Sequence, residues 1–237
     1  MLKNINLEKI LFLDIETVPE VYNYTELDEA KRSLWDIKSK YKQRNGLTAE
    51  EVYEQAGIYA EFGKIVCISV GLIKRGASHQ IRLKSFYGHD EKQLLEEFIS
   101  LLDEHYNTDR HLLCAHNGKE FDFPYLARRI LINGLSLPDL LNIASKKPWE
   151  INHLDTMELW KFGDYKHYTS LDLLTNIFNI PSPKNDITGA DVSKVYWEDE
   201  DVDRIAEYCE KDVLATAQLF LRYQGQSLIA DENVVSV

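Results

Sequence analysis

The amino-acid sequence predicts an α/β domain with a mixed sheet, because segments with strand and helix periodicity alternate along its 237 residues. Its composition, 44% apolar and 11% aromatic residues, is enough for a large buried core and argues against a disordered chain. No apolar run approaches the roughly 18 residues that span a bilayer, and the N-terminal residues lack the apolar core of a secretory signal. We therefore expect one globular domain without a membrane segment.

The expected elements of the first half are a strand at 9–17, two helices within 25–60, strands at 63–73 and 79–88 that form a hairpin, and a helix that follows Asp90. Thr48 and Glu51 have the spacing of a capping box, which marks the start of the second helix within 25–60. Asp90 is a good N-cap for the helix behind it.

The expected elements of the second half are a strand at 110–117, a helix at 121–134, a short strand within 149–160, a helix that follows Ser170, and a long helix at 199–223. Gly134 suits the end of its helix, and Pro181 ends the helix that Ser170 begins. The tail at 224–237 is expected to be frayed.

Charge is unevenly distributed along the chain. The net charge of −12 alone disfavours a polyanionic partner such as nucleic acid. However, residues 186–212 hold ten acids and three bases, whereas residues 116–168 balance seven of each. The middle of the chain can therefore still contact a phosphate backbone. The candidate contacts are the bases of that segment: Lys119, Arg128, Arg129, Lys146, Lys147, Lys161 and Lys166.

The three cysteines, Cys67, Cys114 and Cys209, are odd in number and show no C-x-x-C spacing. This pattern argues against a disulfide framework and a zinc knuckle, and it favours a reducing compartment, the cytoplasm. We expect each cysteine to be a small buried apolar side chain.

Two carboxylates interrupt the apolar strand "LFLDIET". Because side chains alternate along a strand, Asp14 and Glu16 point to the same face. With 39 acids in 237 residues, about six acid-x-acid pairs arise by chance, so the pair is also compatible with a solvated strand end. The apolar run before Asp14 instead indicates a central strand.

Two further segments carry candidate acids. Asp122 follows the strand at 110–117, at the start of the next helix, where an acid also simply favours the helix dipole. Tyr208 and Asp212 lie four residues apart on one helix face, next to an apolar segment. Four carboxylates brought together repel one another, and divalent cations relieve that repulsion. Oxygen ligands suit Mg²⁺ or Mn²⁺, and a pair of such ions promotes phosphoryl displacement.

Three motifs, "LFLDIET", "NGKEFDFPYL" and "YCEKD", in this order resemble the three exonuclease motifs of the DEDD superfamily. A tyrosine four residues before the last aspartate resembles its tyrosine branch. The middle motif is similar to that of the proofreading domain of family-B DNA polymerases. "HLDTMELW" and "IPSPKNDITGADV" resemble the related stand-alone bacterial exonucleases. The resemblance covers roughly residues 9–223.

The resemblance implies an RNase H-like fold, with a five-stranded mixed sheet flanked by helices, and two divalent ions, Mg²⁺ or Mn²⁺. By this resemblance Asp14 bridges both ions, Glu16 and Asp212 hold the ion on the nucleophile side, and Asp122 holds the second. Tyr208 is implied to orient the attacking water, since its hydroxyl can donate and accept.

Three more residues are candidate substrate contacts. By the same resemblance, the backbone of Thr17, just after the Asp14 and Glu16 pair, is placed to meet the 3′ end of the terminal nucleotide. Asn117 matches the asparagine of the middle motif and either contacts the substrate or steadies Asp122. Phe121 is expected to line the substrate groove, although core packing is the simpler interpretation for an aromatic residue at this position.

The implied organisation is a single exonuclease domain at 1–223 with a helical insertion at 20–61 and a C-terminal tail at 224–237. No polymerase domain fits in the remainder, so we expect a stand-alone enzyme or a subunit. Four aromatic residues of the insertion either form its core or wedge unpaired bases: Trp35, Tyr41, Tyr53 and Phe62.

The function expected from the resemblance is 3′-5′ hydrolysis of single-stranded DNA, which releases nucleoside monophosphates, possible partners being replication or repair proteins. One alternative is an exoribonuclease that resembles RNase D, so RNA stays open as a substrate. The other is a nucleic-acid-binding module without activity, which the complete set of acids disfavours.

Overall fold

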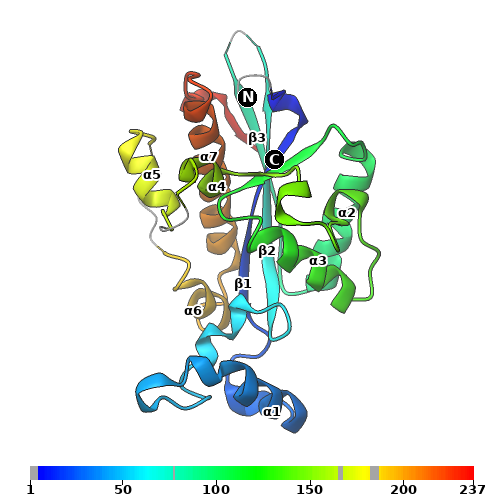
Figure 1. The fold of residues 1–237 in the computed structure, drawn as a ribbon, viewed down its shortest axis with the longest axis vertical. Coiled ribbons are helices and arrows are strands. Elements are labelled where there is room, and N and C mark those ends of the chain that lie inside the picture. Colours follow the sequence, from blue (N-terminus) through cyan, green and yellow to red (C-terminus); the bar gives the residue numbers. More distant parts are fainter. Residues whose placement is uncertain (1–4, 77, 165–167, 182–186) are drawn as a thin grey trace.

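The computed structural model describes residues 5–76, 78–164, 168–181 and 187–237. A six-stranded mixed sheet lies between two layers of helices (Figure 1). In the order β5-β4-β1-β2-β3-β6, its strands are Leu154–Asp155, Leu112–Ala115, Ile10–Pro19, Gly63–Lys74, Gln80–Tyr87 and Val234–Ser236. The helices α1 to α7 are Glu29–Lys38, Glu91–His105, Asp122–Ile132, Thr156–Lys161, Leu171–Ile177, Val192–Trp197 and Val202–Tyr223. The predicted α/β class with a mixed sheet is confirmed.

Strand β1 lies at the centre of the sheet. It pairs antiparallel with β2, with a register shift between Glu16 and Thr17, and parallel with β4. The parallel pairing ends where Phe12 meets Cys114, so the second half of β1 continues beyond the end of β4. The strand is central, as the apolar run before the acids indicates, but it extends to Pro19, so Asp14 and Glu16 lie within it and not at the C-terminal end that the expected range of 9–17 gives them.

The alternation of β1 assigns its side chains to the two helical layers. Leu11, Leu13 and Ile15 pack in the cluster that includes α2 and α3, whereas Ile10 and Phe12 pack with residues of α7. By the same alternation, Asp14 and Glu16 lie on the face that α7 covers. Two positions that would otherwise bury apolar side chains against α7 thus carry carboxylates.

The sheet differs from the expected five strands by the addition of β6. The tail at 224–237 is not frayed: β6 pairs parallel with β3, and Ile229 is buried in the cluster beneath α7. The three residues "VVS" are too few to give a strand signal in the sequence. Across the described residues, no helix is long and apolar enough to cross a membrane.

The insertion at 20–61 forms a lobe beyond the end of β1, at the bottom of Figure 1. It contains α1 as expected, but its second expected helix is only a 3₁₀ helix, Tyr53–Ile58, although Thr48 and Glu51 form the predicted capping contacts. Its aromatic core is Trp35, Tyr53 and Phe62, which are buried against one another. Of the four candidate wedge residues, Tyr41 is exposed.

Candidate active site

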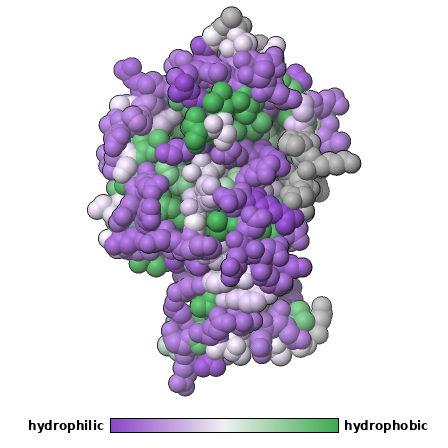
Figure 2. Space-filling model, turned by 180° about the vertical axis from the view of Figure 1, so that it is seen from behind, coloured by the Kyte–Doolittle hydropathy of each residue, from purple (hydrophilic) through white to green (hydrophobic). Residues whose placement is uncertain are grey.

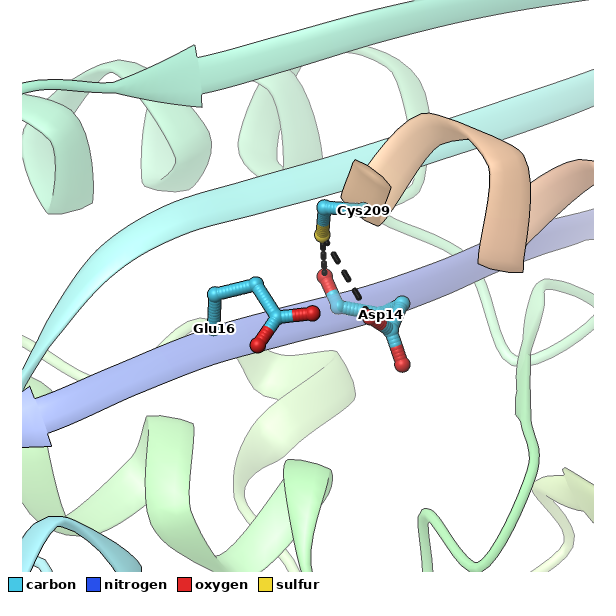
Figure 3. A group of neighbouring side chains, drawn as sticks. All are labelled: Asp14, Glu16 and Cys209. Carbon is cyan, nitrogen blue, oxygen red and sulfur yellow. Dashed lines mark hydrogen bonds between the residues drawn. The ribbon is translucent and has the colours of Figure 1, made fainter. Parts of the chain in front are cut away.

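Four carboxylates from three elements converge beside the middle of β1. Asp14 and Glu16 come from β1, and Figure 3 shows their side chains beneath α7. The pKa of Asp14 is raised well above its ordinary value, first by burial and then by the negative charges of Glu16, Asp122 and Asp212. The pKa of Glu16 is raised by burial and by Asp212. The other three acids singled out from the sequence therefore lie close enough to Asp14 for their charges to act on it, and among the described residues Asp14 and Glu16 are the two acids in the group whose ligand atoms lie within 4.8 Å of one another.

Asp122 is the first residue of α3 and is 3% exposed. Because β4 ends early, the backbone N–H of Ile15 on β1 is free to donate to the Asp122 carboxylate. Burial raises the pKa of Asp122 to about 7, and the charge of Asp155 contributes to the increase. Its Oδ1 atom is buried and has no hydrogen-bond partner among the described residues. A buried carboxylate oxygen without a partner is an energetic cost that a bound cation would offset.

Tyr208 and Asp212 are one turn apart on α7, and the Tyr208 hydroxyl donates a hydrogen bond to the Asp212 carboxylate. Burial raises the pKa of Asp212 to about 6, and this hydrogen bond opposes the increase. Burial and the charges of Asp212, Glu16 and Asp14 raise the pKa of Tyr208 well above its ordinary value. The phenol therefore stays protonated and can act as a hydrogen-bond donor at any physiological pH.

Cys209 is an additional member of the site. It is buried, and its thiol lies 3.4 Å from both the backbone oxygen and Oδ2 of Asp14 (Figure 3). Asp14, Glu16 and Cys209 can each place one ligand atom within 4.8 Å of the others. The expectation of three buried cysteines is confirmed, and all three are free. The contact of Cys209 with Asp14 was not expected, although the stripe of Ile205, Cys209 and Val213 along α7 already indicated that this thiol faces the sheet.

These donors fit a divalent cation. Carboxylate oxygens predominate, and the acids are buried or half-buried. Their negative charges raise the pKa values of Asp14 and Glu16, so ionisation of the full set needs a positive charge among them. Such oxygen-rich sets suit Mg²⁺ or Mn²⁺.

The loop from β4 to α3 is held by Asp155, the N-cap of α4. Its Oδ1 accepts from the backbone N–H of Asn117 at 3.0 Å, and its Oδ2 accepts from the N–H of Lys119 at 3.1 Å. Oδ1 also accepts from the N–H of Met157 at 2.9 Å. Asn117 has a positive φ of 66°, which a fixed loop must stabilise. Asp155 belongs to the segment "HLDTMELW", whose resemblance to the stand-alone exonucleases does not assign this aspartate a role.

A cavity of about 480 Å³ opens beside Glu16. Its lining includes Glu16 and two of the predicted substrate contacts, Thr17 and Phe121. The opposite wall comes from the insertion, through Gln55 and Ile58. Asn117, the third predicted contact, is absent from this lining, and its buried Oδ1 has no partner within the described residues.

Two of the predicted phosphate contacts are paired with acids of the protein. Arg129 is buried and forms a bidentate ion pair with Glu91 of α2, so it stabilises the packing of α3 against α2. Lys119 pairs with Glu158 at 2.7 Å. Lys166 lies outside the described residues.

Comparison with known proteins gives three findings. Residues 58–233 match the family described as predicted 3′-5′ exonucleases related to the exonuclease domain of PolB. DNA polymerases of Pyrococcus glycovorans and Pyrococcus horikoshii are 21% and 23% identical over 142 residues, which is 54% of this chain but 18% and 11% of those proteins. The family B DNA polymerase of Pyrobaculum calidifontis matches 91% of this chain and 24% of its own, with a TM-score of 0.54 and 17% identity. The chain thus spans less than a quarter of each of these polymerases.

Proposed function

Since this chain belongs to the family of predicted 3′-5′ exonucleases related to the exonuclease domain of PolB, we propose that it hydrolyses the 3′-terminal phosphodiester bond of single-stranded DNA with two divalent cations. The products are nucleoside monophosphates and a shortened strand. The observation that carries this proposal is the convergence of four carboxylates beside a tyrosine on α7: Glu16 and Asp122 are buried, Asp14 and Asp212 are half-buried, and the other three raise the pKa of Asp14.

Each of the four carboxylates is assigned to one or both of the proposed ions. Asp14 is central because the charges of the other three acids all act on it, so it is the proposed ligand of both ions. The charge of Asp212 raises the pKa of Glu16, and these two acids would hold the ion on the nucleophile side, while Asp122 would hold the second ion. When bound there, Mg²⁺ or Mn²⁺ would stabilise the negative charge that develops on the phosphoryl group.

Tyr208 is the proposed positioning group for the attacking water. Its hydroxyl is held by Asp212 and stays protonated, so it can donate to one oxygen while its lone pairs accept from another. A hydroxyl fixed in this way accepts a hydrogen bond from the attacking water and so reduces the entropic cost of its attack.

The cavity beside Glu16 is the proposed site of the 3′-terminal nucleotide. Thr17 and Phe121 line it, and Phe121 offers an aromatic surface to a sugar or base. The hydroxyl of Thr17 bonds to Tyr125, whose own hydroxyl donates to the backbone oxygen of Gly57 at 2.8 Å. This link fixes the insertion against β1 and gives the cavity a rigid wall. Asn117 is proposed to steady the loop that leads to Asp122.

Digestion of end-labelled oligonucleotides tests the proposal. The protein should shorten a single-stranded DNA whose 5′ end is blocked and should leave the same strand intact when its 3′ end is blocked. Chelation of divalent cations should stop the reaction. Faster digestion of a matched RNA would reassign the substrate to RNA, and the absence of hydrolysis with any cation on either strand would leave only a binding role.

A further inference from the structure

The insertion lobe carries a basic segment in an otherwise acidic protein. Residues 31–44 contain six basic residues and one acid, whereas the whole chain has a net charge of −12. The segment spans α1 and the turns that follow it. The bases are Lys31, Arg32, Lys38, Lys40, Lys42 and Arg44.

Most of this positive charge is available to a ligand. Lys31 forms an ion pair with Glu20. In contrast, four bases have no carboxylate within ion-pair distance in the described part of the chain: Lys38, Lys40, Lys42 and Arg44. Three of these four are exposed, and Lys42 is half-buried. Like charges so close together repel one another, and a polyanion would relieve that repulsion.

Exposed apolar groups lie among these charges. Leu34 and Ile37 of α1 are 58% and 63% exposed, and Tyr41 on the following turn is 53% exposed. Their spacing of three and four residues places them along one side of the segment. The ammonium group of Lys42 lies 5.8 Å from the centre of the Tyr41 ring and 5.6 Å from that of Tyr59. Seen from behind, the lobe at the bottom of Figure 2 shows hydrophobic residues among hydrophilic ones.

This basic surface is connected to the candidate active site. Lys42 donates a hydrogen bond from Nζ to Oε1 of Gln55 at 2.5 Å. Gln55 in turn lines the cavity that also contains Glu16 and Thr17. One residue of the basic segment therefore contacts the wall of the cavity in which the terminal nucleotide is proposed to bind.

We propose that residues 38–44 form a second nucleic-acid contact that holds the single strand outside the active site. Lys38, Lys40, Lys42 and Arg44 bind phosphates, and the exposed ring of Tyr41 stacks on a base. Basic side chains interleaved with an aromatic ring are typical of sequence-independent single-strand binding. This inference rests on the proposed function. The hydrogen bond from Lys42 to Gln55 links the basic surface to the cavity, and this link favours the substrate strand over an acidic protein as the ligand.

The test compares two triple variants that remove the same charge. In Lys38→Gln/Lys40→Gln/Arg44→Gln the basic surface is neutralised, whereas Arg75→Gln/Lys92→Gln/Arg110→Gln removes three exposed bases elsewhere. All six side chains are exposed, so both variants should fold. Binding of a fluorescent DNA strand of about 16 nucleotides is measured in EDTA at several salt concentrations.

The first variant should bind the strand about tenfold more weakly than the second. Its negative slope of log K against log salt should be shallower than that of the second variant by about 2. Tyr41→Ala should also weaken binding about tenfold, because a stacking partner is lost. Equal affinity and equal slope for the two triple variants would overturn the inference, and an acidic protein would then be the better match for this surface.

A second measurement separates this inference from the proposed function. In Mg²⁺, both triple variants should hydrolyse a trinucleotide at the wild-type rate, because so short a strand is held by the cavity alone. Failure of the wild-type protein to hydrolyse any strand would refute the proposed function but would leave the binding comparison valid. If the first variant lost trinucleotide hydrolysis as strongly as it lost binding of the longer strand, the inference would be overturned, since the bases would then act on the site itself.

Discussion

Among single residues, Tyr208 has the most specific proposed role. Replacement of Tyr208 by phenylalanine keeps the ring and its packing but removes the hydroxyl that donates to Asp212. We expect the single-turnover rate at saturating Mg²⁺ to fall by about 10²-fold, the lower end of the range for positioning groups, with little change in DNA affinity.

Tyr87→Phe is the matched control for this experiment. The Tyr87 hydroxyl also donates to an aspartate of α7, Asp203, at 2.9 Å, but on the surface. Its loss should leave the rate unchanged. If the two variants showed the same rate constant as the wild type, Tyr208 would have no part in the chemical step.

The site residues were predictable from the sequence to different degrees. Alternation along a strand placed Asp14 and Glu16 on one face, and helical spacing did the same for Tyr208 and Asp212. Only the resemblance to exonuclease motifs linked these segments, because spacing within one element says nothing about its neighbours in space. The contact between Cys209 and Asp14 depends on how α7 crosses β1, which no local pattern encodes.

The loop between β4 and α3 is the element on which the position of Asp122 depends. Asp155→Asn keeps the shape of the side chain but replaces one acceptor with a donor, so it conflicts with the backbone N–H groups of Asn117 or Lys119. We expect the single-turnover rate to fall at least about tenfold and the Mg²⁺ concentration for half-maximal rate to rise.

Asp90→Asn is the control, since Asp90 caps α2 by accepting from the N–H of Gln93, away from the acids. It should cost about 1 kcal/mol or less of stability and leave the Mg²⁺ dependence unchanged. An Asp155→Asn protein with the wild-type Mg²⁺ dependence would show that the loop is positioned by other contacts.

Most elements were predicted because their signals are local. The caps Asp90 and Ser170 accept hydrogen bonds from their helices as expected, and the hairpin of β2 and β3 was correctly placed. The exceptions depend on tertiary contacts. The second helix of the insertion is replaced by a 3₁₀ segment, in which Tyr53 packs on Trp35. Strand β6 exists because the edge of β3 is available to pair with it.

At the scale of the whole molecule, the cluster of buried acids makes the stability of the fold depend on pH. Asp122 has a pKa of about 7 in the folded chain and an ordinary value near 4 in the unfolded one. Between these values the folded chain binds more protons than the unfolded chain. The contribution of Asp122 to the stability of the fold is therefore fully present below about pH 4 and is lost as the pH rises through about 7.

The measurement is the melting temperature in EDTA of the wild type and of Asp122→Asn. From about pH 5 to about pH 8, the wild type should lose roughly 4 °C or more relative to the variant. Burial lowers the pKa of His153 to about 4, which acts in the opposite direction but equally in both proteins. Mg²⁺ should reduce the difference, because a cation stabilises the ionised acids. Parallel curves of melting temperature against pH for the two proteins would show that ionisation of Asp122 does not destabilise the fold.

The most direct test of the proposed function is the single-turnover rate of 3′-end release from single-stranded DNA at saturating Mg²⁺ by Asp14→Ala. Asp103→Ala, which removes an exposed acid of α2, is the control and should match the wild type. Asp14 is the proposed ligand of both ions, so its loss should abolish the reaction while circular dichroism shows an intact fold. A rate above about one-tenth of the wild type, a barrier increase below ~1.4 kcal/mol, would contradict the proposed role of the four acids.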